Sequence, residues 1–215
     1  MTGIVRVVVA LIAIALGVGA SVWWQQSSKI VPDYLNTFPE PRTLADFTLF
    51  NQDGKEVTKR VFDGYWSLLF SGYTYCPDVC PTTLSELNQI YPQLQQLPSK
   101  DPIQVVFLSV DPLRDTPQRL HDYIQFFNPD FIALTGPHTQ LFPLARSMGM
   151  MYAVHADETN SANESYLVDH SASVVLINPL GQAVGRFKPE YEAGKLPVSN
   201  AEKILADMAQ VTKGG

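Results

Sequence analysis

The sequence predicts an α/β domain built on a central mixed sheet, and two observations lead to that class. Short apolar runs of buried-strand length alternate with segments whose apolar residues recur every three or four positions, the period of an α-helix. Near the end of the chain, two strand-like runs joined by a turn are followed by one more helical segment. With 215 residues, the chain is long enough for one domain with a sizeable core and one additional segment.

The additional segment is the N-terminal stretch of residues 1–24. The 18 residues from Val7 to Trp24 carry no charge, and as a helix they would span about 27 Å, close to the hydrocarbon thickness of a bilayer. Arg6 precedes this run and Trp23 closes it together with Trp24, a pattern typical of an anchor inserted with its N-terminus inside. We therefore expect one N-terminal transmembrane helix, with the remaining chain outside the membrane, in the periplasm if the source is a bacterium.

A cleaved signal peptide is the alternative interpretation, because small residues at 18–20 precede Ser21. The apolar run is longer than the usual core of a signal peptide, which favours the uncleaved anchor. Residues 25–45 are rich in Gln, Ser and Pro and are predicted to form a tether. The folded domain is predicted to occupy residues 46–215.

The charge of the chain argues against one class of partner. The formal net charge is −6, and because Arg6 is the only charged side chain among residues 1–24, the remainder carries −7. The sequence has no basic run that could follow a phosphate backbone, so we expect no nucleic-acid partner.

The predicted strands are apolar runs bounded by turn-forming residues. Two of them, 65–70 and 103–110, are the most apolar and are expected to be buried. The last two are predicted to form a hairpin around the turn at 179–182. In chain order the predicted strands are 47–50, 65–70, 103–110, 131–134, 150–154, 171–178 and 183–187.

The predicted helices follow strand ends. The first, 81–97, has apolar residues at helical spacing, although Pro92 predicts a kink or an early end near Tyr91. The second begins with Thr116 as its cap and Pro117 at its first helical position. The remaining predicted helices are 137–148 and 198–211. This order of elements matches the thioredoxin-like architecture, which is an α/β sandwich.

The two cysteines of the chain, Cys76 and Cys80, lie between an apolar strand and the first predicted helix. In an exported protein the usual role of such a pair is a structural disulfide. A bridge that closes only three intervening residues would remove little chain entropy and would therefore stabilise weakly. A helix N-terminus also favours the thiolate, the form that binds metal or attacks disulfides. The pair is therefore predicted to form a soft-metal site or a redox-active site.

Copper fits the available ligands best among the metals that thiolates select. Two cysteines are too few for an iron–sulfur cluster or an all-cysteine zinc site, whereas copper can be held by two sulfurs and one imidazole. His170 is the best candidate because it directly precedes an apolar strand, and His155 is a competitor. His121 and His138 fall on predicted helices and are expected at the surface.

Three aspartates are candidates for a supporting role around the donors. Asp111 ends the strand 103–110, and the carboxyl ends of strands are where open α/β sheets place their sites. An equally good interpretation of Asp111 is a turn and helix cap. Asp169 precedes His170 and could orient its imidazole, and Asp78 lies between the cysteines.

Three motifs in this order resemble the Sco/SenC family of membrane-anchored copper proteins. They are Tyr-Cys-Pro-Asp-Val-Cys-Pro, Ser-Val-Asp-Pro-Leu-Arg-Asp-Thr-Pro and Tyr-x-x-Asp-His-Ser, within a resemblance that runs from about Leu44 to Val211. The resemblance implies a thioredoxin-like fold, Cu(I) or Cu(II) bound by Cys76, Cys80 and His170, and delivery to the CuA centre of cytochrome c oxidase subunit II. An upstream copper donor would be a further partner.

Two other functions use the same fold. A thiol–disulfide oxidoreductase, or a redox sensor, would use Cys76 and Cys80 to reduce the cysteines of the partner. Thioredoxin-type motifs hold two residues between the cysteines, and the three found here favour metal over fast exchange. A peroxidase ranks last, because Thr74 is present but no arginine is near the motif in the sequence.

Overall fold

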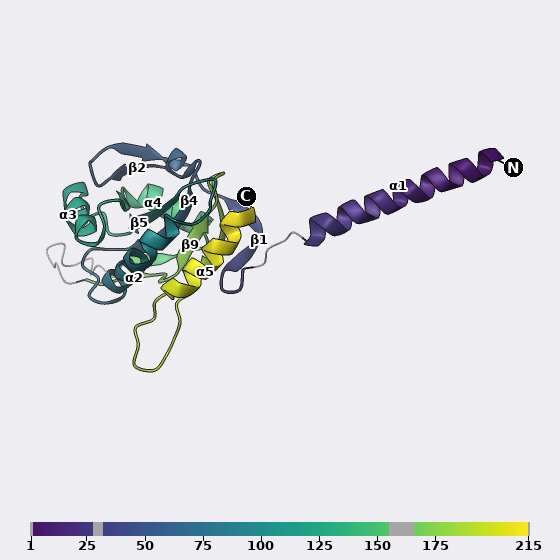
Figure 1. Cartoon of the computed structure of the whole chain (residues 1–215). Coiled ribbons are helices and arrows are strands. Elements are labelled where there is room, and N and C mark those ends of the chain that lie inside the picture. The colour runs from purple at the N-terminus through teal and green to yellow at the C-terminus, as the bar shows by residue number, and fades with distance from the viewer. Residues whose placement is uncertain (1, 28–31, 155–165, 215) are drawn as a thin grey trace.

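The computed structural model describes residues 2–27, 32–154 and 166–214, and it has a central eight-stranded sheet (Figure 1). The strand order is β1-β10-β9-β4-β5-β6-β2-β3, and a separate two-stranded sheet joins β7 to β8. The strands are β1 (Asn36–Thr43), β2 (Thr48–Asn51), β3 (Glu56–Thr58), β4 (Trp66–Gly72), β5 (Ile103–Ser109), β6 (Ile132–Thr135), β7 (Tyr152–Val154), β8 (Val168–His170), β9 (Val174–Ile177) and β10 (Gln182–Phe187). The helices are α1 (Thr2–Ser27), α2 (Val79–Leu94), α3 (Pro117–Phe127), α4 (His138–Ser147) and α5 (Ala201–Val211), with short 3₁₀ turns at Lys59–Phe62 and Thr212–Gly214.

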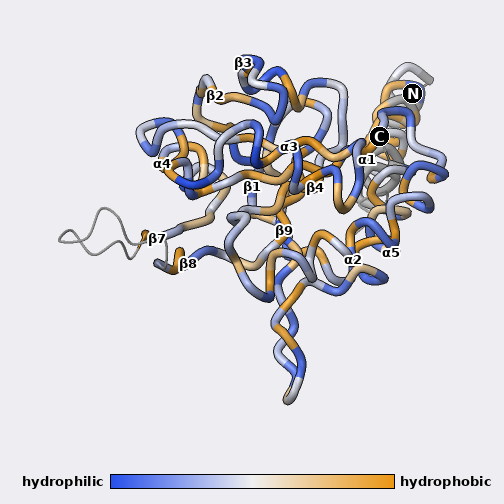
Figure 2. The backbone as a smooth tube through the Cα atoms, turned by 90° about the vertical axis from the view of Figure 1, so that its left-hand side faces the viewer, coloured by the Kyte–Doolittle hydropathy of each residue, from blue (hydrophilic) through white to orange (hydrophobic). Residues whose placement is uncertain are grey.

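The sheet is mixed, as predicted. β4 pairs in parallel with β5, and β5 in parallel with β6, whereas β9 runs antiparallel to both β4 and β10. All seven residues of β5 are buried, which is typical of a strand covered on both faces. In Figure 2 the tube around β4 and β9 is largely orange, the colour of apolar residues.

Successive side chains of the central strands face two separate cores, one on each side of the sheet. On β5, Val105 and Phe107 pack with apolar residues of α2, α3 and α5. Val106 and Leu108 pack on the other side with residues of α4. This arrangement is the three-layer α/β sandwich expected from the element order, and α2 lies beside α5 on one face (Figure 1).

The predicted tether of residues 25–45 includes a strand of the domain. Asn36–Thr43 forms β1, which pairs with β10 at the edge of the sheet. The backbone N–H groups of Asp33, Tyr34 and Leu35 all donate to the buried carboxylate of Asp207 on α5, at 2.6–3.0 Å. The strand has almost no buried side chain and contains two prolines, which suits an edge strand but leaves no apolar alternation in the sequence.

Both ends of α2 differ from the predicted helix 81–97. α2 begins at Val79 and continues through Pro92 to Leu94, so the early end near Tyr91 does not occur. A proline this close to the helix end removes one of the last backbone hydrogen bonds, while the buried side chains of Ile90 and Leu94 keep the last turn packed. The predicted start of α3 is confirmed, because the Thr116 hydroxyl accepts from the backbone N–H of Arg119.

The segment that was predicted to form a membrane anchor lies within the helix α1. Among the residues whose placement is described, no helix is both long enough and apolar enough to cross a membrane.

Candidate metal centre

Three donor atoms from distant parts of the chain meet at one end of the central sheet. The sulfurs of Cys76 and Cys80 and a ring nitrogen of His170 all lie within 4.8 Å of one another. Cys80 Sγ lies 3.3 Å from His170 Nε2. The predicted ligand set is therefore brought together by the fold, and the two cysteines are not joined by a disulfide.

The turn from β4 to α2 positions the two sulfurs differently. Cys80 is the second residue of α2 and is fully buried, whereas Cys76 lies in the preceding turn and is partly exposed. The sulfur of Cys80 fits against the backbone of β4 only because residue 72 is glycine. A Cβ atom on Gly72 would lie 2.6 Å from Cys80 Sγ, well inside van der Waals contact.

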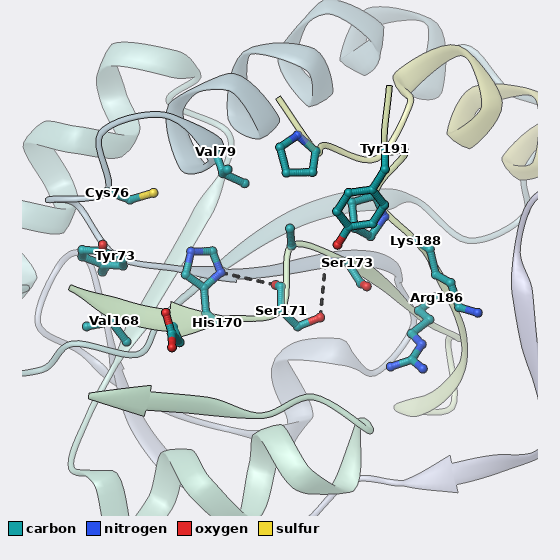
Figure 3. Close-up of a pocket in the computed structure, with 14 residues that line it drawn as sticks. Tyr73, Cys76, Val79, Val168, His170, Ser171, Ser173, Arg186, Lys188 and Tyr191 are labelled. Carbon is teal, nitrogen blue, oxygen red and sulfur yellow. Dashed lines mark hydrogen bonds between the residues drawn. The ribbon is translucent and has the colours of Figure 1, made fainter. Parts of the chain in front are cut away.

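The imidazole of His170 is held at the end of β8, where the residue pairs with Tyr152 of β7. The rings of Phe70 and Tyr73 contact it edge-to-face, each with its centroid 5.9 Å from that of the imidazole. Nδ1 lies 3.3 Å from the carbonyl oxygen of Ser171 (Figure 3). A proton on Nδ1 would be donated to this carbonyl, which leaves the Nε2 lone pair directed at the sulfurs.

The two thiols have opposite acidities. Hydrogen bonding with Cys80 and, to a smaller extent, with His170 lowers the pKa of Cys76 to about 4, against the opposing effect of burial. Burial in turn raises the pKa of Cys80, and so does its hydrogen bond with Cys76. Cys76 is therefore the thiolate at neutral pH, and Cys80 is the thiol that donates to it.

The three aspartates that were predicted to support the donors differ in burial and in their hydrogen bonds. Asp78 is exposed before the start of α2, and its side chain makes no capping hydrogen bond. The buried carboxylate of Asp111 accepts hydrogen bonds from Arg114 Nε and from the Tyr166 hydroxyl, both at 2.5 Å. Asp169 is exposed on β8, next to His170, whose Nδ1 lies 3.3 Å from the carbonyl oxygen of Ser171.

The other histidines do not join the described cluster. His121 lies on α3 beside Gln125, and its Nδ1 is 3.5 Å from Asp53. His138 is half-buried at the start of α4, with Nδ1 2.9 Å from the Tyr152 hydroxyl, and is not simply at the surface as expected. His155, the competing ligand, lies outside the described residues.

A buried polar cluster behind the cysteine turn was missed by the sequence reasoning. The fully buried Asp115 accepts hydrogen bonds from the Thr74 N–H, the Thr74 hydroxyl and the Ser109 hydroxyl, at 3.0, 2.6 and 2.7 Å. Burial raises the pKa of Asp115, although these hydrogen bonds oppose the shift. Arg119 Nε donates to Thr74 Oγ1 at 2.6 Å, and its guanidinium lies over the Tyr75 ring. The cluster fixes the two residues that precede Cys76.

Arg119 of this cluster lies beside the cysteine turn, where the sequence analysis expected no arginine. The absence of an arginine near the motif counted against a peroxidase, but Arg119 contacts Thr74 from 45 residues away. Sequence distance hid the contact because α3 returns the chain to the end of β4. The ligand cluster of two sulfurs and one imidazole still distinguishes the site from one built on a single attacking cysteine.

A search against family models matches residues 36–206 to SCO1/SenC. The chain belongs to the SCO1/SenC family. The match begins at the first residue of β1 and covers all three ligand positions, so the resemblance based on the three motifs is confirmed.

Solved structures of the same family share the fold. The copper-bound ScoI of Arabidopsis thaliana is 32% identical, with a TM-score of 0.63 over 80% of this chain and 96% of that one. The apo Sco1 of Thermus thermophilus is 31% identical, with a TM-score of 0.65 over 83% and 96% of the two chains. The predicted mixed α/β fold of the thioredoxin-like kind is thereby confirmed.

Curated relatives match over different shares of their length. The SCO2-like protein of Rickettsia conorii is 32% identical over 185 residues, which are 84% of this chain and 88% of that protein. The mitochondrial SCO2 homologue of Homo sapiens is 39% identical over 137 residues, or 63% of this chain. The matched region spans half the length of the human and bovine SCO2 homologues.

Proposed function

We propose that the chain binds copper through Cys76, Cys80 and His170 and delivers it to the CuA centre of cytochrome c oxidase subunit II. The observation that carries the proposal is the convergence of two sulfurs and one imidazole nitrogen within 4.8 Å. Thiolate and imidazole donors suit copper, and three donors suit Cu(I) in particular. Copper-bound Sco structures and a Sco relative described as a cytochrome c oxidase assembly protein support both halves of the proposal.

The unequal exposure of the donors suits transfer by ligand exchange. Cys76 is partly exposed and already a thiolate at neutral pH, whereas Cys80 is buried and must lose its proton when the metal binds. An incoming ligand can therefore replace Cys76 first, while Cys80 and His170 still hold the ion. An upstream donor protein would load the site by the reverse sequence.

The location of the protein belongs to the same proposal. The uncharged run from Val7 to Trp24, preceded by Arg6, supports an N-terminal membrane anchor with the N-terminus inside. The copper-binding domain would then lie on the outer side, in the periplasm of a bacterium. The acceptor would be a membrane protein that exposes its copper site on that side.

A second function, thiol–disulfide exchange or redox sensing, is favoured by the low pKa of Cys76. The Cys76 thiolate would attack one sulfur of a partner disulfide and form a mixed disulfide, releasing the other partner sulfur as a thiolate. Cys80, after losing its proton, would then attack Cys76 and release the second partner thiol. The partner gains two electrons and becomes a dithiol, and the chain becomes the Cys76–Cys80 disulfide. A Sco relative is described as containing a disulfide switch.

The variant His170→Ala separates these two functions. Copper binding needs the imidazole, so we expect the affinity of the reduced chain for Cu(I) to fall by more than about tenfold. Thiol chemistry keeps both cysteines, so reduction of a small disulfide substrate should continue. His121→Ala, which removes a histidine from α3, is the matched control and should leave both activities unchanged. Unaltered copper affinity in His170→Ala would refute the copper-site assignment.

A further inference from the structure

A groove of about 670 Å³ leads away from the metal centre along the sheet (Figure 3). Cys76 and His170 line one end, and Arg186 and Lys188 of the β10 region line the other, beside Tyr191. Its size lies within the range of ligand-binding pockets, about 300–1,000 Å³. Cys80 does not line the groove. A ligand atom that replaces Cys76 on the metal can therefore enter by this path.

The far end of the groove carries positive charge on an acidic protein. Within residues 32–154 and 166–214, no carboxylate pairs with Lys188, which is exposed. Arg186 donates to the backbone carbonyl of Gly149, and the described part of the chain offers its guanidinium no carboxylate either. The chain as a whole has a net charge of −6. Against this acidic background, the two cations form a local positive patch that attracts an anionic group.

The acidic side chains near the two cations are already engaged or lie elsewhere in the groove. Glu190 pairs with Lys203 at 2.5 Å, and Glu192 pairs with Lys195 at 2.7 Å. Asp169 lines the groove at the opposite end, beside His170. The positive charge of the groove therefore lies at the end away from the metal centre, which gives a bound acidic segment a preferred direction.

We propose that this groove binds an acidic polypeptide segment of a protein that exchanges copper with the site, which deepens the proposed function and rests on it. The soft ligand of the segment would lie at Cys76 and His170, and its carboxylates would lie some residues away, at Arg186 and Lys188. The ring of Tyr191 is 83% exposed and offers an aromatic surface against which such a segment can pack.

Two synthetic peptides test the proposal on the full-length reduced chain without metal. Each has one methionine and a glycine spacer, followed by a run of aspartates in one peptide and of lysines in the other. Fluorescence anisotropy of the labelled peptides measures the dissociation constants at low salt. We expect the aspartate peptide to bind more tightly, and added salt to weaken it because the attraction is between exposed charges.

The variant Lys188→Gln should raise the dissociation constant of the aspartate peptide about two- to fivefold, which is the effect of losing one exposed ion pair. Lys55→Gln is the control, because it also removes one positive charge, from the turn between β2 and β3 at the other edge of the sheet. It should leave the dissociation constant of the aspartate peptide unchanged. Arg186→Gln provides a second test, with circular dichroism as the check of folding because its guanidinium holds Gly149.

Three outcomes would overturn the proposal. They are equal binding of the two peptides, equal weakening by Lys55→Gln and Lys188→Gln, and binding of anionic vesicles but not of the aspartate peptide. Copper loading of the same samples is measured separately by metal analysis. A chain that loads copper but binds both peptides equally refutes the groove alone, whereas one that prefers the aspartate peptide without loading copper refutes the copper function.

Discussion

At the residue scale, the site depends on two cysteines that have the same chemistry and different surroundings. Cys80 is buried beneath the turn and keeps its proton, and Cys76 receives the resulting S–H hydrogen bond at a partly exposed position. Burial disfavours the charged form of a thiol, whereas hydrogen bonds to a thiolate favour it. One sulfur is thereby prepared for attack or exchange while its neighbour is protected.

The metal-free chain should accordingly lose one thiolate on acidification, with a midpoint near pH 4. The pKa of Cys76 in the folded chain, about 4, lies below its ordinary value of 9.0, so the thiolate persists as the pH falls from 9 and is protonated only near 4. The thiolate absorbance in the ultraviolet measures this titration. Cys76→Ser should abolish the transition, and Cys80→Ala should move it upward because the side chain that donates the hydrogen bond to Cys76 is lost. A midpoint close to 9 in the native chain would contradict the assignment.

Asp115 supports the site from behind, although it touches none of the donor atoms in the described structure. Asp115→Asn replaces one of two carboxylate oxygens by an amide N–H, which cannot accept the hydrogen bonds of Thr74 or Ser109. We expect the free energy of unfolding to fall by about 1–3 kcal/mol, the cost of buried donors left without acceptors. Urea denaturation measures it. Asp122→Asn, an exposed change on α3, is the control, and an equally small effect of both variants would be inconsistent with this role.

At the element scale, the end of β4 and the short β7–β8 sheet bring together residues that are 90 positions apart. β4 delivers the cysteine turn over the end of the sheet, and β8 presents His170 to it. Cys80 can approach β4 so closely because Gly72 has no side chain. The position of the buried sulfur therefore depends on the end of one strand as much as on α2.

Gly72→Ala tests this dependence. The added methyl group would lie 2.6 Å from Cys80 Sγ and 2.9 Å from the Phe107 ring, and such overpacking costs about 1–3 kcal/mol. Gly136→Ala creates a comparable clash with Leu49, whose Cδ2 would be 2.5 Å away, but far from the ligands in the chain. Both variants should be less stable to urea, and only Gly72→Ala should also weaken copper binding. Equal copper affinities in the two variants would contradict the close-approach argument.

The elements also show why parts of the fold were not predicted. The buried strands β4 and β5 are continuous apolar runs and were predicted from the sequence, as was the grouping of the two cysteines with His170. β1 is exposed along nearly its whole length, and β3 and β8 have three residues each, too few for a periodic signal. Their positions follow from tertiary pairing, which no local pattern records.

The site, like the fold, was predicted from the sequence only in part. The residue types of the donors and their spacing could be predicted because a soft metal needs sulfur and imidazole ligands. The contact of Arg119 with Thr74, and the approach of Cys80 to Gly72, arise only when folding brings α3 and α2 against the end of β4. Asp115 follows the strand of the second motif without any signal of its own in the sequence, and only the structure shows its three hydrogen bonds.

At the scale of the whole molecule, the fold places a small polar centre at the end of an otherwise apolar sandwich. Two cores fill the faces of the sheet, and the donors lie where β4 ends and the partly exposed Cys76 meets the groove. The proposed transfer of copper needs this combination, because the ion must be held by buried donors and still be reachable by a partner. The family of the chain and the geometry of the donors point to copper as the ion that the site holds.

The most direct test of this account is X-ray absorption spectroscopy of the reduced, full-length chain loaded with Cu(I). The account predicts one copper per chain with two sulfur neighbours and one nitrogen neighbour, and loss of the nitrogen in His170→Ala. A spectrum with only oxygen or nitrogen neighbours, or one that His170→Ala leaves unchanged, would contradict the assignment of Cys76, Cys80 and His170 as the copper ligands.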